Sequence, residues 1–350
     1  MVAAVEIGGH KVGPNHGCFI IAEAGVNHNG DVETALALID AAAEAGADAV
    51  KFQTFVPELL VTPDAPKAEY QSRATEAIES QYEMLTRLQL SSDAHRRLMG
   101  HCKEKGILFL STPFDEASAD LLEKLDVAAF KVSSGEITNL PFLSYLARKN
   151  RPLIISTGMS DLTEVETAVN VVGMAGNDHF ILLHCVSNYP ANPADANLRA
   201  IATMEKAFDV PVGYSDHTPG TAVAIAAAAL GACVIEKHMT LDRSLPGPDH
   251  QASLEPDEFK MMVTAIRIVD VALGHGRKEP AFSEADTAAV ARKSLVAAHD
   301  IPVGTILTEE MIAIKRPGTG LPPSMLSNLV GRATRVDISA DTLLRLELLA

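Results

Sequence analysis

Residues 210–240 read VPVGYSDHTPGTAVAIAAAALGACVIEKHMT, and this stretch decides the fold. Two short apolar runs, VPV (210–212) and CVI (233–235), flank an alanine-rich segment (219–230) of helical length. The pattern predicts a strand, a helix and a second strand that runs parallel to the first. Each apolar run turns polar where it ends, so His217 and His238 are expected at the same edge of the sheet.

These two histidines indicate a site for a divalent metal ion. A single histidine beside a strand is more often a core residue with satisfied hydrogen bonds than a ligand, but a pair in matching positions favours ligation. A histidine pair completed by oxygen ligands accepts several divalent ions, so the sequence does not identify the metal. The neighbouring Asp216 is expected either to orient a metal ligand or to form a turn.

Apolar runs of the same kind recur along the chain. They lie at residues 18–22, 49–54, 107–112, 129–134, 153–157 and 180–185, and helical stretches at 31–45, 115–125, 161–174, 197–208 and 255–273 separate or follow them. Strands without polar alternation are buried on both faces. Eight strand-helix units in succession predict a closed (β/α)8 TIM barrel over residues 1–275.

Two further parts complete the predicted organisation. Residues 276–293 are polar and are expected to be a linker, and residues 294–350 form a small β-rich domain that is expected to dock on a barrel. Residues 55–90 form an insertion after the second strand, and a loop of this length is usually functional or loosely ordered.

Polar groups gather at the carboxyl ends of the predicted strands, where barrel enzymes keep their chemistry. Lysine inside an apolar strand is costly unless an anion meets it, so Lys51 and Lys131 predict a bound anion. Serine and threonine at these ends either contact that anion or cap the following helices. Carboxylates suited to proton handling are Glu23, Glu136, Asp216 and Asp249, although Asp249 is equally typical of a turn.

The composition excludes several classes of function. The chain of 350 residues has a formal net charge of -16, which disfavours binding to nucleic-acid phosphates. Cys18, Cys102, Cys185 and Cys233 lie far apart, as is typical of reduced cysteines in a cytoplasmic protein. The sequence has neither a charged leader nor the ~18 apolar residues of a spanning helix, so neither export nor membrane insertion is expected.

Nine motifs in chain order resemble the sialic acid synthase family. They are EAGVNH (23–28), KFQT (51–54), STPF (111–114), FKVSSGE (130–136), STGM (156–159), HC (184–185), GYSDHT (213–218), EKH (236–238) and residues 243–249. Within the family, APKAEYQ (65–71) looks most like the bacterial N,N'-diacetyllegionaminate synthase branch. Residues 294–350, with KRPG at 315–318, resemble its antifreeze-like (SAF) domain.

The resemblance implies a metal-dependent transferase that condenses phosphoenolpyruvate with an N-acylated mannosamine-type sugar. The acceptor is N-acetylmannosamine or 2,4-diacetamido-2,4,6-trideoxymannose, and the products are a nine-carbon 2-keto acid and phosphate. It further implies a homodimer whose small domains are exchanged, so that Arg316 of the partner subunit reaches the N-acyl group.

The same resemblance assigns residues to the site. His217 and His238 hold Mn²⁺, or else Mg²⁺ or Co²⁺. Phosphoenolpyruvate is bound by Lys51, Thr112, Lys131, Ser134, Ser156 and Ser215, with either Ser187 or Asn188 on the phosphate. Sugar hydroxyls are contacted by Glu23, Gln53, Tyr189 and Asp249, and Glu136 or the metal activates the water. His28 and His184 are either ligands or packing residues.

Three alternatives remain open from the sequence. One keeps the chemistry and changes the aldehyde, as in a pseudaminate synthase or another phosphoenolpyruvate-aldehyde synthase. Another is a Schiff-base aldolase with Lys51 or Lys131 as nucleophile, in which the paired histidines would be idle. The last is a binding module in which the small domain grips carbohydrate or ice and the barrel is only a scaffold.

Overall fold

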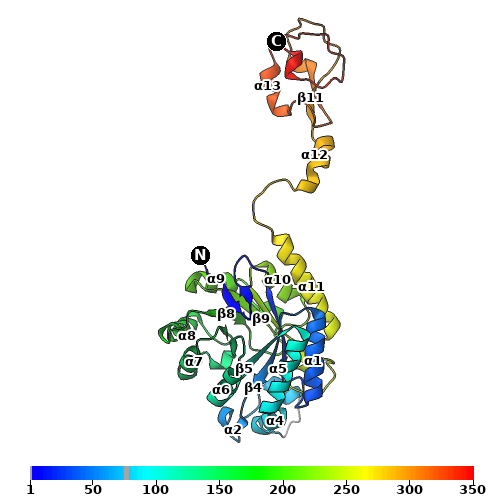
Figure 1. Cartoon of the computed structure of the whole chain (residues 1–350). Coiled ribbons are helices and arrows are strands. Elements are labelled where there is room, and N and C mark those ends of the chain that lie inside the picture. The colour runs from blue at the N-terminus through cyan, green and yellow to red at the C-terminus, as the bar shows by residue number, and fades with distance from the viewer. Residues whose placement is uncertain (1, 75–78) are drawn as a thin grey trace. The chain divides into compact units, whose positions relative to one another are not determined.

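The computed structural model describes residues 2–74 and 79–350 and divides the chain into two compact units, Met1–Gly274 and His275–Ala350 (Figure 1). In the described residues of the first unit, eight parallel strands close into a barrel, with the last strand hydrogen-bonded to the first. The predicted TIM barrel is therefore confirmed. The strands are β3 (Phe19–Gly25), β4 (Ala49–Thr54), β5 (Leu108–Pro113), β6 (Phe130–Val132), β7 (Leu153–Ser156), β8 (Phe180–Cys185), β9 (Val212–Asp216) and β10 (Val234–His238).

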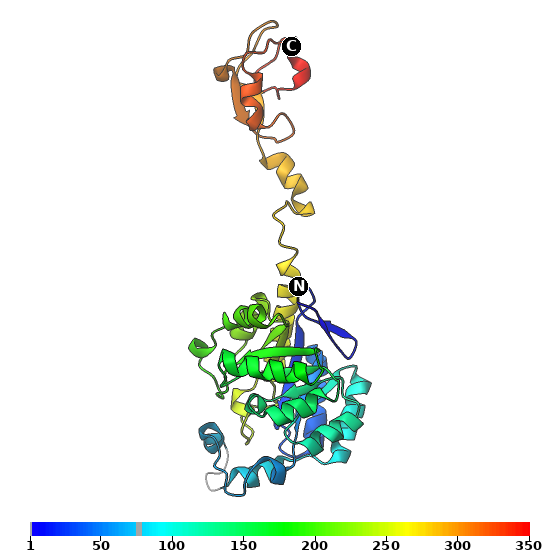
Figure 2. The ribbon, with the colours of Figure 1, turned by 90° about the vertical axis from the view of Figure 1, so that its left-hand side faces the viewer.

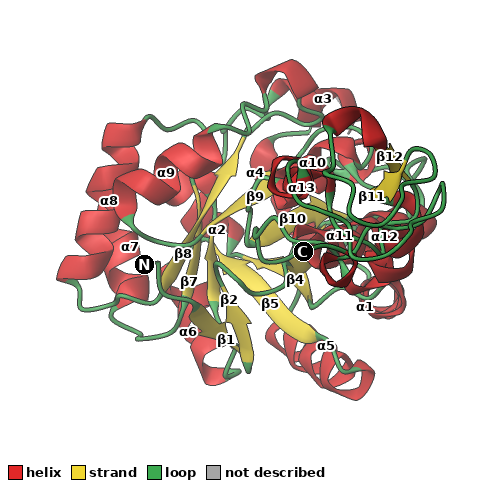
Figure 3. Cartoon of the chain, turned by 90° about the horizontal axis from the view of Figure 1, so that it is seen from above, coloured by secondary structure: helices red, strands yellow, loops and turns green. Residues whose placement is uncertain are grey.

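Helices surround the barrel, as the view from above shows (Figure 3). They are α1 (Val32–Ala45), α5 (Ser92–Lys105), α6 (Glu116–Lys124), α7 (Leu140–Ala147), α8 (Leu162–Met174), α9 (Ala200–Phe208), α10 (Ala222–Ala229) and α11 (Pro256–Leu273). The first is capped by Asp31, whose side chain accepts a hydrogen bond from the Thr34 amide. No helix among the described residues is long and apolar enough to cross a membrane.

The two ends of the barrel are covered differently. At the amino ends of the strands lies a hairpin of β1 (Val5–Ile7) and β2 (His10–Val12) (Figure 2). Its apolar side chains pack into the barrel floor. At the carboxyl ends lies the 55–90 insertion, which contains α2 (Pro57–Leu60), α3 (Glu69–Ala74) and α4 (Gln81–Leu88). Met84, Leu85 and Leu88 of α4 pack against Phe55 and Val26. The insertion thus forms one wall above the open end.

The second unit has its own small core. It contains α12 (Ala285–Ala291), β11 (Ser294–Ala297), β12 (Ile312–Lys315) and α13 (Leu326–Leu329), and β11 pairs with β12 in antiparallel fashion. Leu295, Ile301, Leu307 and Leu344 are buried together in its interior. The segment predicted as a linker contains α12, and its Ala289 carbonyl accepts a hydrogen bond from the Gly318 amide at 2.7 Å. Part of that segment therefore belongs structurally to the small unit.

Candidate active site

A cavity of about 470 Å³ opens at the carboxyl ends of the barrel strands. Fourteen of the residues predicted from the sequence line it. They are Glu23, Lys51, Gln53, Thr112, Lys131, Ser134, Glu136, Ser156, Ser187, Tyr189, Ser215, His217, His238 and Asp249. The structure therefore brings together groups that are spread over more than 200 positions of the sequence.

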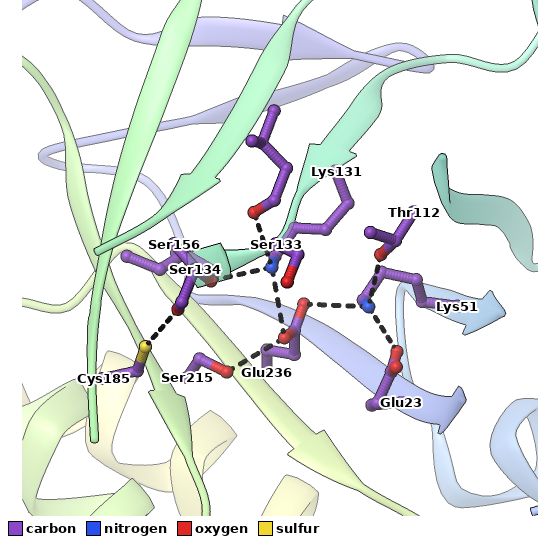
Figure 4. Close-up of polar contacts among 12 residues, drawn as sticks. Glu23, Lys51, Thr112, Lys131, Ser133, Ser134, Ser156, Cys185, Ser215 and Glu236 are labelled. Carbon is purple, nitrogen blue, oxygen red and sulfur yellow. Dashed lines mark hydrogen bonds and ion pairs between the residues drawn. The ribbon is translucent and has the colours of Figure 1, made fainter. Parts of the chain in front are cut away.

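The two strand lysines lie side by side inside this cavity, linked by one carboxylate (Figure 4). Glu236 lies 3.7 Å from the ammonium group of Lys51 and 3.6 Å from that of Lys131. Lys51 also pairs with Glu23 at 2.6 Å and donates to Thr112 at 3.0 Å. Carboxylates of the protein itself thus balance part of the charge of the two buried lysines.

Burial and charge act on these carboxyl groups in opposite directions. Burial raises the pKa of Glu236, but the ammonium groups of Lys131 and Lys51 outweigh burial and lower that pKa to about 2. For Glu23, burial dominates over the attraction of Lys51 and raises the pKa to about 7. At neutral pH the cavity therefore holds one firmly anionic carboxylate and one that is close to its midpoint.

Hydroxyl groups bond to both Lys131 and Glu236. The ammonium group of Lys131 donates a hydrogen bond to Ser156 at 2.7 Å, and the Ser215 hydroxyl donates to Glu236 at 2.9 Å. Ser134, which lies in a short 3-10 helix (Ser134–Glu136), accepts a hydrogen bond from the Gly158 amide at 3.0 Å. Ammonium, hydroxyl and amide donors in one recess are the groups that bind a phosphate or a carboxylate.

Gly158 has no room for a side chain. A Cβ atom there would lie 2.2 Å from the Ser187 hydroxyl, 2.8 Å from the Ser134 hydroxyl and 2.9 Å from the Cys185 sulfur. A glycine at position 158, two residues after β7, therefore lets these three groups come together. Ser187 and Asn188 are the two alternatives for a phosphate contact. Ser187 lines the cavity, whereas Asn188 is absent from its lining.

A second polar group, formed by Glu23, Gln53 and Asp249, converges on Gly25. A Cβ atom on this glycine, whose φ is +51°, would lie 3.1 Å from Glu23, 3.4 Å from Gln53 and 3.6 Å from Asp249. Burial raises the pKa of Asp249 to about 6, although Lys51 acts in the opposite direction. Carboxyl and amide groups so arranged suit the hydroxyl groups of a sugar.

The two imidazoles of the predicted metal site lie next to each other in the cavity lining, edge to face. The ring centres of His217 and His238 lie 5.4 Å apart, and the Tyr189 ring lies 4.1 Å from that of His217. His217 Nδ1 donates to the Val186 carbonyl at 2.7 Å, so Nε2 carries the lone pair. The Ser215 hydroxyl lies 3.4 Å from Nε2 but donates to Glu236, which leaves that lone pair available. Among the described residues, His238 Nδ1 is buried without a hydrogen-bond partner, and Asp249 Oδ2 lies 3.9 Å from it.

The state of these imidazoles fits a divalent cation. Burial lowers the pKa of His217 to about 4 and that of His238 well below its usual value, so both are neutral at pH 7. Neutral imidazole is the form that binds a metal. In the described part of the chain, no group of three or more His, Cys, Asp or Glu side chains is placed to hold a metal. Oxygen atoms of substrate or water would therefore complete the coordination.

Glu136 also lines the cavity. Its carboxylate accepts a hydrogen bond from the Asn139 amide at 2.7 Å. Burial raises its pKa, and the hydrogen bond from Asn139 only partly opposes this effect. Such a carboxyl group is suited to exchange a proton with water.

Four of the residues named from the sequence are not part of the cavity lining: Asp216, Arg316, His28 and His184. Asp216 does not line the cavity, because strand alternation turns it outward, where it pairs with Lys237. Arg316 lies in the second unit, where its Nε donates to the Ala291 carbonyl. His28 and His184 are also absent from the cavity lining.

The central carboxylate, Glu236, was not predicted as a site residue. It precedes His238 by two positions in β10, so alternation places both side chains inside the barrel. This periodicity would have identified it. The apolar wall contributed by Leu60, Met84 and Leu88 was also missed, because apolar residues in short helices are more often typical of core packing than of a ligand site.

The comparisons with known proteins agree with this site. The NeuB family matches residues 38–278, and the SAF domain matches residues 292–350. N,N'-diacetyllegionaminic acid synthase of Legionella pneumophila is 50% identical over 331 residues, which cover 93% of each chain. The protein of that name from Campylobacter jejuni is 47% identical over 328 residues, which cover 93% of this chain and 98% of that one.

A solved structure gives the same answer. That of N-acetylneuraminic acid synthetase from Leptospira borgpetersenii in complex with citrate has a TM-score of 0.72 and 38% identity, over 82% of this chain and 95% of that one. The predicted resemblance to sialic acid synthases and the predicted SAF domain are thereby confirmed. The chain belongs to the NeuB family, and the protein is an enzyme of that family.

Proposed function

We propose that the protein condenses phosphoenolpyruvate with the open-chain form of an N-acylated mannosamine-type sugar, giving a nine-carbon 2-keto acid and phosphate. The observation that carries this proposal is the placement of two buried lysines and two neutral imidazoles in one cavity. The relatives named above act in legionaminic and sialic acid synthesis by name, which supports the same substrate class for this chain.

Phosphoenolpyruvate would lie between the lysines. Lys51 and Lys131 offset its charge, and Thr112, Ser134, Ser156, Ser187 and Ser215 supply hydroxyl donors around it. The acidic surface of the protein would repel a trianion, so this local pair of cations is what admits it.

The acceptor sugar would lie toward Gly25 and the insertion. Glu23, Gln53, Tyr189 and Asp249 would contact its hydroxyls. Among the described residues, the cavity lining holds no cation other than Lys51 and Lys131, and its outer wall is formed by apolar residues such as Leu60 and Met84. This favours an unphosphorylated acceptor with apolar substituents, namely 2,4-diacetamido-2,4,6-trideoxymannose ahead of N-acetylmannosamine. A pseudaminate-type acceptor is the alternative.

The reaction can be written with this chain's residues. Carbon 3 of phosphoenolpyruvate attacks the aldehyde carbon, so that the carbon 2–carbon 3 π pair forms the new carbon-carbon bond and carbon 2 is left cationic. The carbonyl π pair moves to the aldehyde oxygen, which would take a proton from the protonated form of Glu23 and become a hydroxyl. The Glu236 carboxylate would stabilise that centre electrostatically. Water adds to carbon 2 and gives its proton to Glu23 or Glu136, and the tetrahedral species then expels phosphate.

We further propose that His217 and His238 hold Mn²⁺ or a similar ion. A divalent ion there would act as a Lewis acid toward the aldehyde. Treatment with a chelator should then abolish activity, and Mn²⁺ should restore it.

The Schiff-base alternative rests on Lys131, whose pKa is lowered by burial. Lys51 is less suited, because Glu23 and Glu236 together outweigh burial and raise its pKa. Borohydride in the presence of substrate should leave both lysines unmodified under our proposal. A stable lysine adduct would support the aldolase instead.

We also propose a homodimer in which Arg316 of the partner subunit reaches the N-acyl group. Arg316 is exposed in the second unit, which supports its availability to another chain. All four cysteines lie within the described residues, where they are buried and not bonded to one another, which supports a cytoplasmic location. Light scattering would test the dimer, and Arg316→Ala should raise the KM for the sugar alone.

The proposed function is tested by sugar-dependent phosphate release. Phosphoenolpyruvate is incubated with Mn²⁺ and either N-acetylmannosamine or the diacetamido sugar. Release is expected with at least one sugar, and more rapidly with the diacetamido sugar. If neither sugar releases phosphate, the substrate assignment is wrong.

A further inference from the structure

A fully buried ion pair lies on the outer side of the two strands that carry the imidazoles. Lys237 Nζ lies 2.7 Å from Asp216 Oδ2, and neither side chain is exposed to solvent. The same ammonium group donates to the Thr218 carbonyl. Asp216 Oδ1 accepts from the Thr218 amide at 2.9 Å and from its hydroxyl at 2.8 Å. The pair is therefore one closed network of hydrogen bonds.

The position of this network in the strands is informative. The parallel ladder between β9 and β10 ends at the Asp216 and Lys237 partners. The next residue on each strand is a histidine of the proposed metal site. Asp216 is the last residue of β9, so His217 follows the strand and no ladder hydrogen bond to β10 holds it.

The network connects the two strands at the point where the ladder of backbone hydrogen bonds ends. It ties Lys237, which precedes His238, to both residues that flank His217. On the opposite side, His217 is held through its ring by the Val186 carbonyl and through its own carbonyl by the Ala191 amide. The His217 backbone is thus fixed from both sides, and one of the two sides is the ion pair.

We propose that Asp216 and Lys237 are positioning residues, which set the separation of the His217 and His238 imidazoles and thereby the affinity for a divalent cation. The inference rests on the proposed function, because it assumes that the imidazoles bind a cation. A purely structural role does not require ionic groups here, since apolar residues often replace a buried ion pair without loss of stability. An ionic network with fixed geometry does specify the strand register beside the ligands.

The test is direct titration of the substrate-free protein with Mn²⁺, followed by the loss of the electron paramagnetic resonance signal of free Mn²⁺. The double variant Asp216→Asn/Lys237→Met removes both charges, so that neither is left buried alone. Groups that orient metal ligands typically change metal affinity by 10- to 100-fold. The dissociation constant of the double variant should therefore rise by about that factor, and saturating Mn²⁺ should restore most of kcat.

A matched control separates positioning from stability. Arg267 pairs with Asp48 at 2.6 Å. This pair lies at the amino ends of the strands, which is the end of the barrel opposite the imidazoles. Asp48→Asn/Arg267→Met should lower the free energy of unfolding and leave Mn²⁺ affinity unchanged. If the Asp216/Lys237 variant binds Mn²⁺ within twofold of the unaltered protein, the inference is overturned.

A milder variant covers the case in which the double variant does not fold. Thr218→Val keeps the side-chain shape and removes one hydrogen bond to Asp216, so Mn²⁺ affinity should fall about threefold. Unchanged affinity in this variant overturns the inference and leaves the proposed function intact. If the unaltered protein binds no Mn²⁺ and releases no phosphate in the presence of sugar, both fail together.

Discussion

The Oε1 atom of Glu236 lies 3.6 Å from the ammonium group of Lys131, in the interior of the barrel. Its other oxygen lies 3.7 Å from Lys51, so one carboxylate balances two buried cations. An incoming anion would share those cations with Glu236. The electrostatics of the site are therefore set by a competition between the protein's carboxylate and the ligand.

Glu236→Gln should change how strongly added phosphate stabilises the folded protein. Removing one member of a buried ionic cluster typically costs about 3 kcal/mol of stability or more, because the remaining charges lose their partner. Inorganic phosphate should recover more stability in the variant than in the unaltered protein, since it replaces the lost carboxylate. Thermal unfolding with and without phosphate measures both effects.

Glu136→Gln is the matched control, because Glu136 lines the same cavity but pairs only with Asn139 in the hydrogen bonds described above. Its response to phosphate should equal that of the unaltered protein. An equal or smaller response in Glu236→Gln would contradict the competition.

Lys131→Met should weaken phosphoenolpyruvate binding. The change removes a buried ammonium group and its hydrogen bond to Ser156. A hydrogen bond to a charged group is worth about 1.5–3 kcal/mol, so kcat/KM for phosphoenolpyruvate should fall roughly 10- to 100-fold. Steady-state kinetics at saturating sugar measure this.

Lys149→Met serves as the control for that loss. Lys149 is also largely buried, but it pairs with Asp120 and Glu123 on the helices outside the barrel. Its removal should reduce stability without changing the KM for phosphoenolpyruvate. Similar KM values in the two lysine variants would argue against the anion site.

His217→Ala should abolish activity almost completely while the protein stays folded. The substitution removes one of the two neutral imidazoles, and the remaining one cannot hold a cation alone. Circular dichroism and the rate of phosphate release measure folding and activity. His184→Ala is the control, because that ring lies outside the cavity lining and bonds to the Ala196 carbonyl. Full activity in His217→Ala would favour the binding-module alternative.

Glu23 should make stability depend on pH. Its pKa is raised from 4.5 to about 7 in the folded protein, chiefly by burial. The folded state therefore holds this proton more tightly than the unfolded state does. The resulting stabilisation is complete below about pH 4.5 and is lost as the pH rises through 7. A shift of 2.5 pKa units (7 − 4.5) corresponds to about 3 kcal/mol.

Glu23→Gln removes this titration. Urea unfolding at pH 5 and at pH 8 should show that the variant gains about 2–3 kcal/mol relative to the unaltered protein between the two conditions. A difference between the two proteins that is the same at both pH values would show that Glu23 does not titrate in this range.

Much of the barrel could be predicted because its signals are local. Runs such as 49–54 and 180–185 begin with apolar residues and form strands that are buried at all but one position, and they alternate with helices whose caps, such as Asp31, are also readable. The amino-terminal hairpin was not predicted. Its strands are three residues long, and only contact with the barrel floor makes Val5 and Val12 core residues.

The site could be predicted where residue type and strand position agree, as for Lys51, Lys131 and His238. Glu236 was overlooked because a glutamate between two apolar residues and a lysine has no obvious partner in sequence. Its partners, Lys51 and Lys131, lie more than 100 positions away. Asp216 was expected near the reacting groups, but the single-residue alternation of β9 turns it to the outer face.

The most direct measurement uses phosphoenolpyruvate labelled with ¹⁸O in the oxygen that bridges carbon 2 and phosphorus, incubated with Mn²⁺ and the diacetamido sugar. Attack by carbon 3 followed by water addition at carbon 2 predicts that the bond between carbon 2 and the bridging oxygen breaks. All of the label then leaves with phosphate, and one labelled phosphate is released for each nine-carbon 2-keto acid formed. Unlabelled phosphate, or phosphate release that does not require the sugar, would contradict the account.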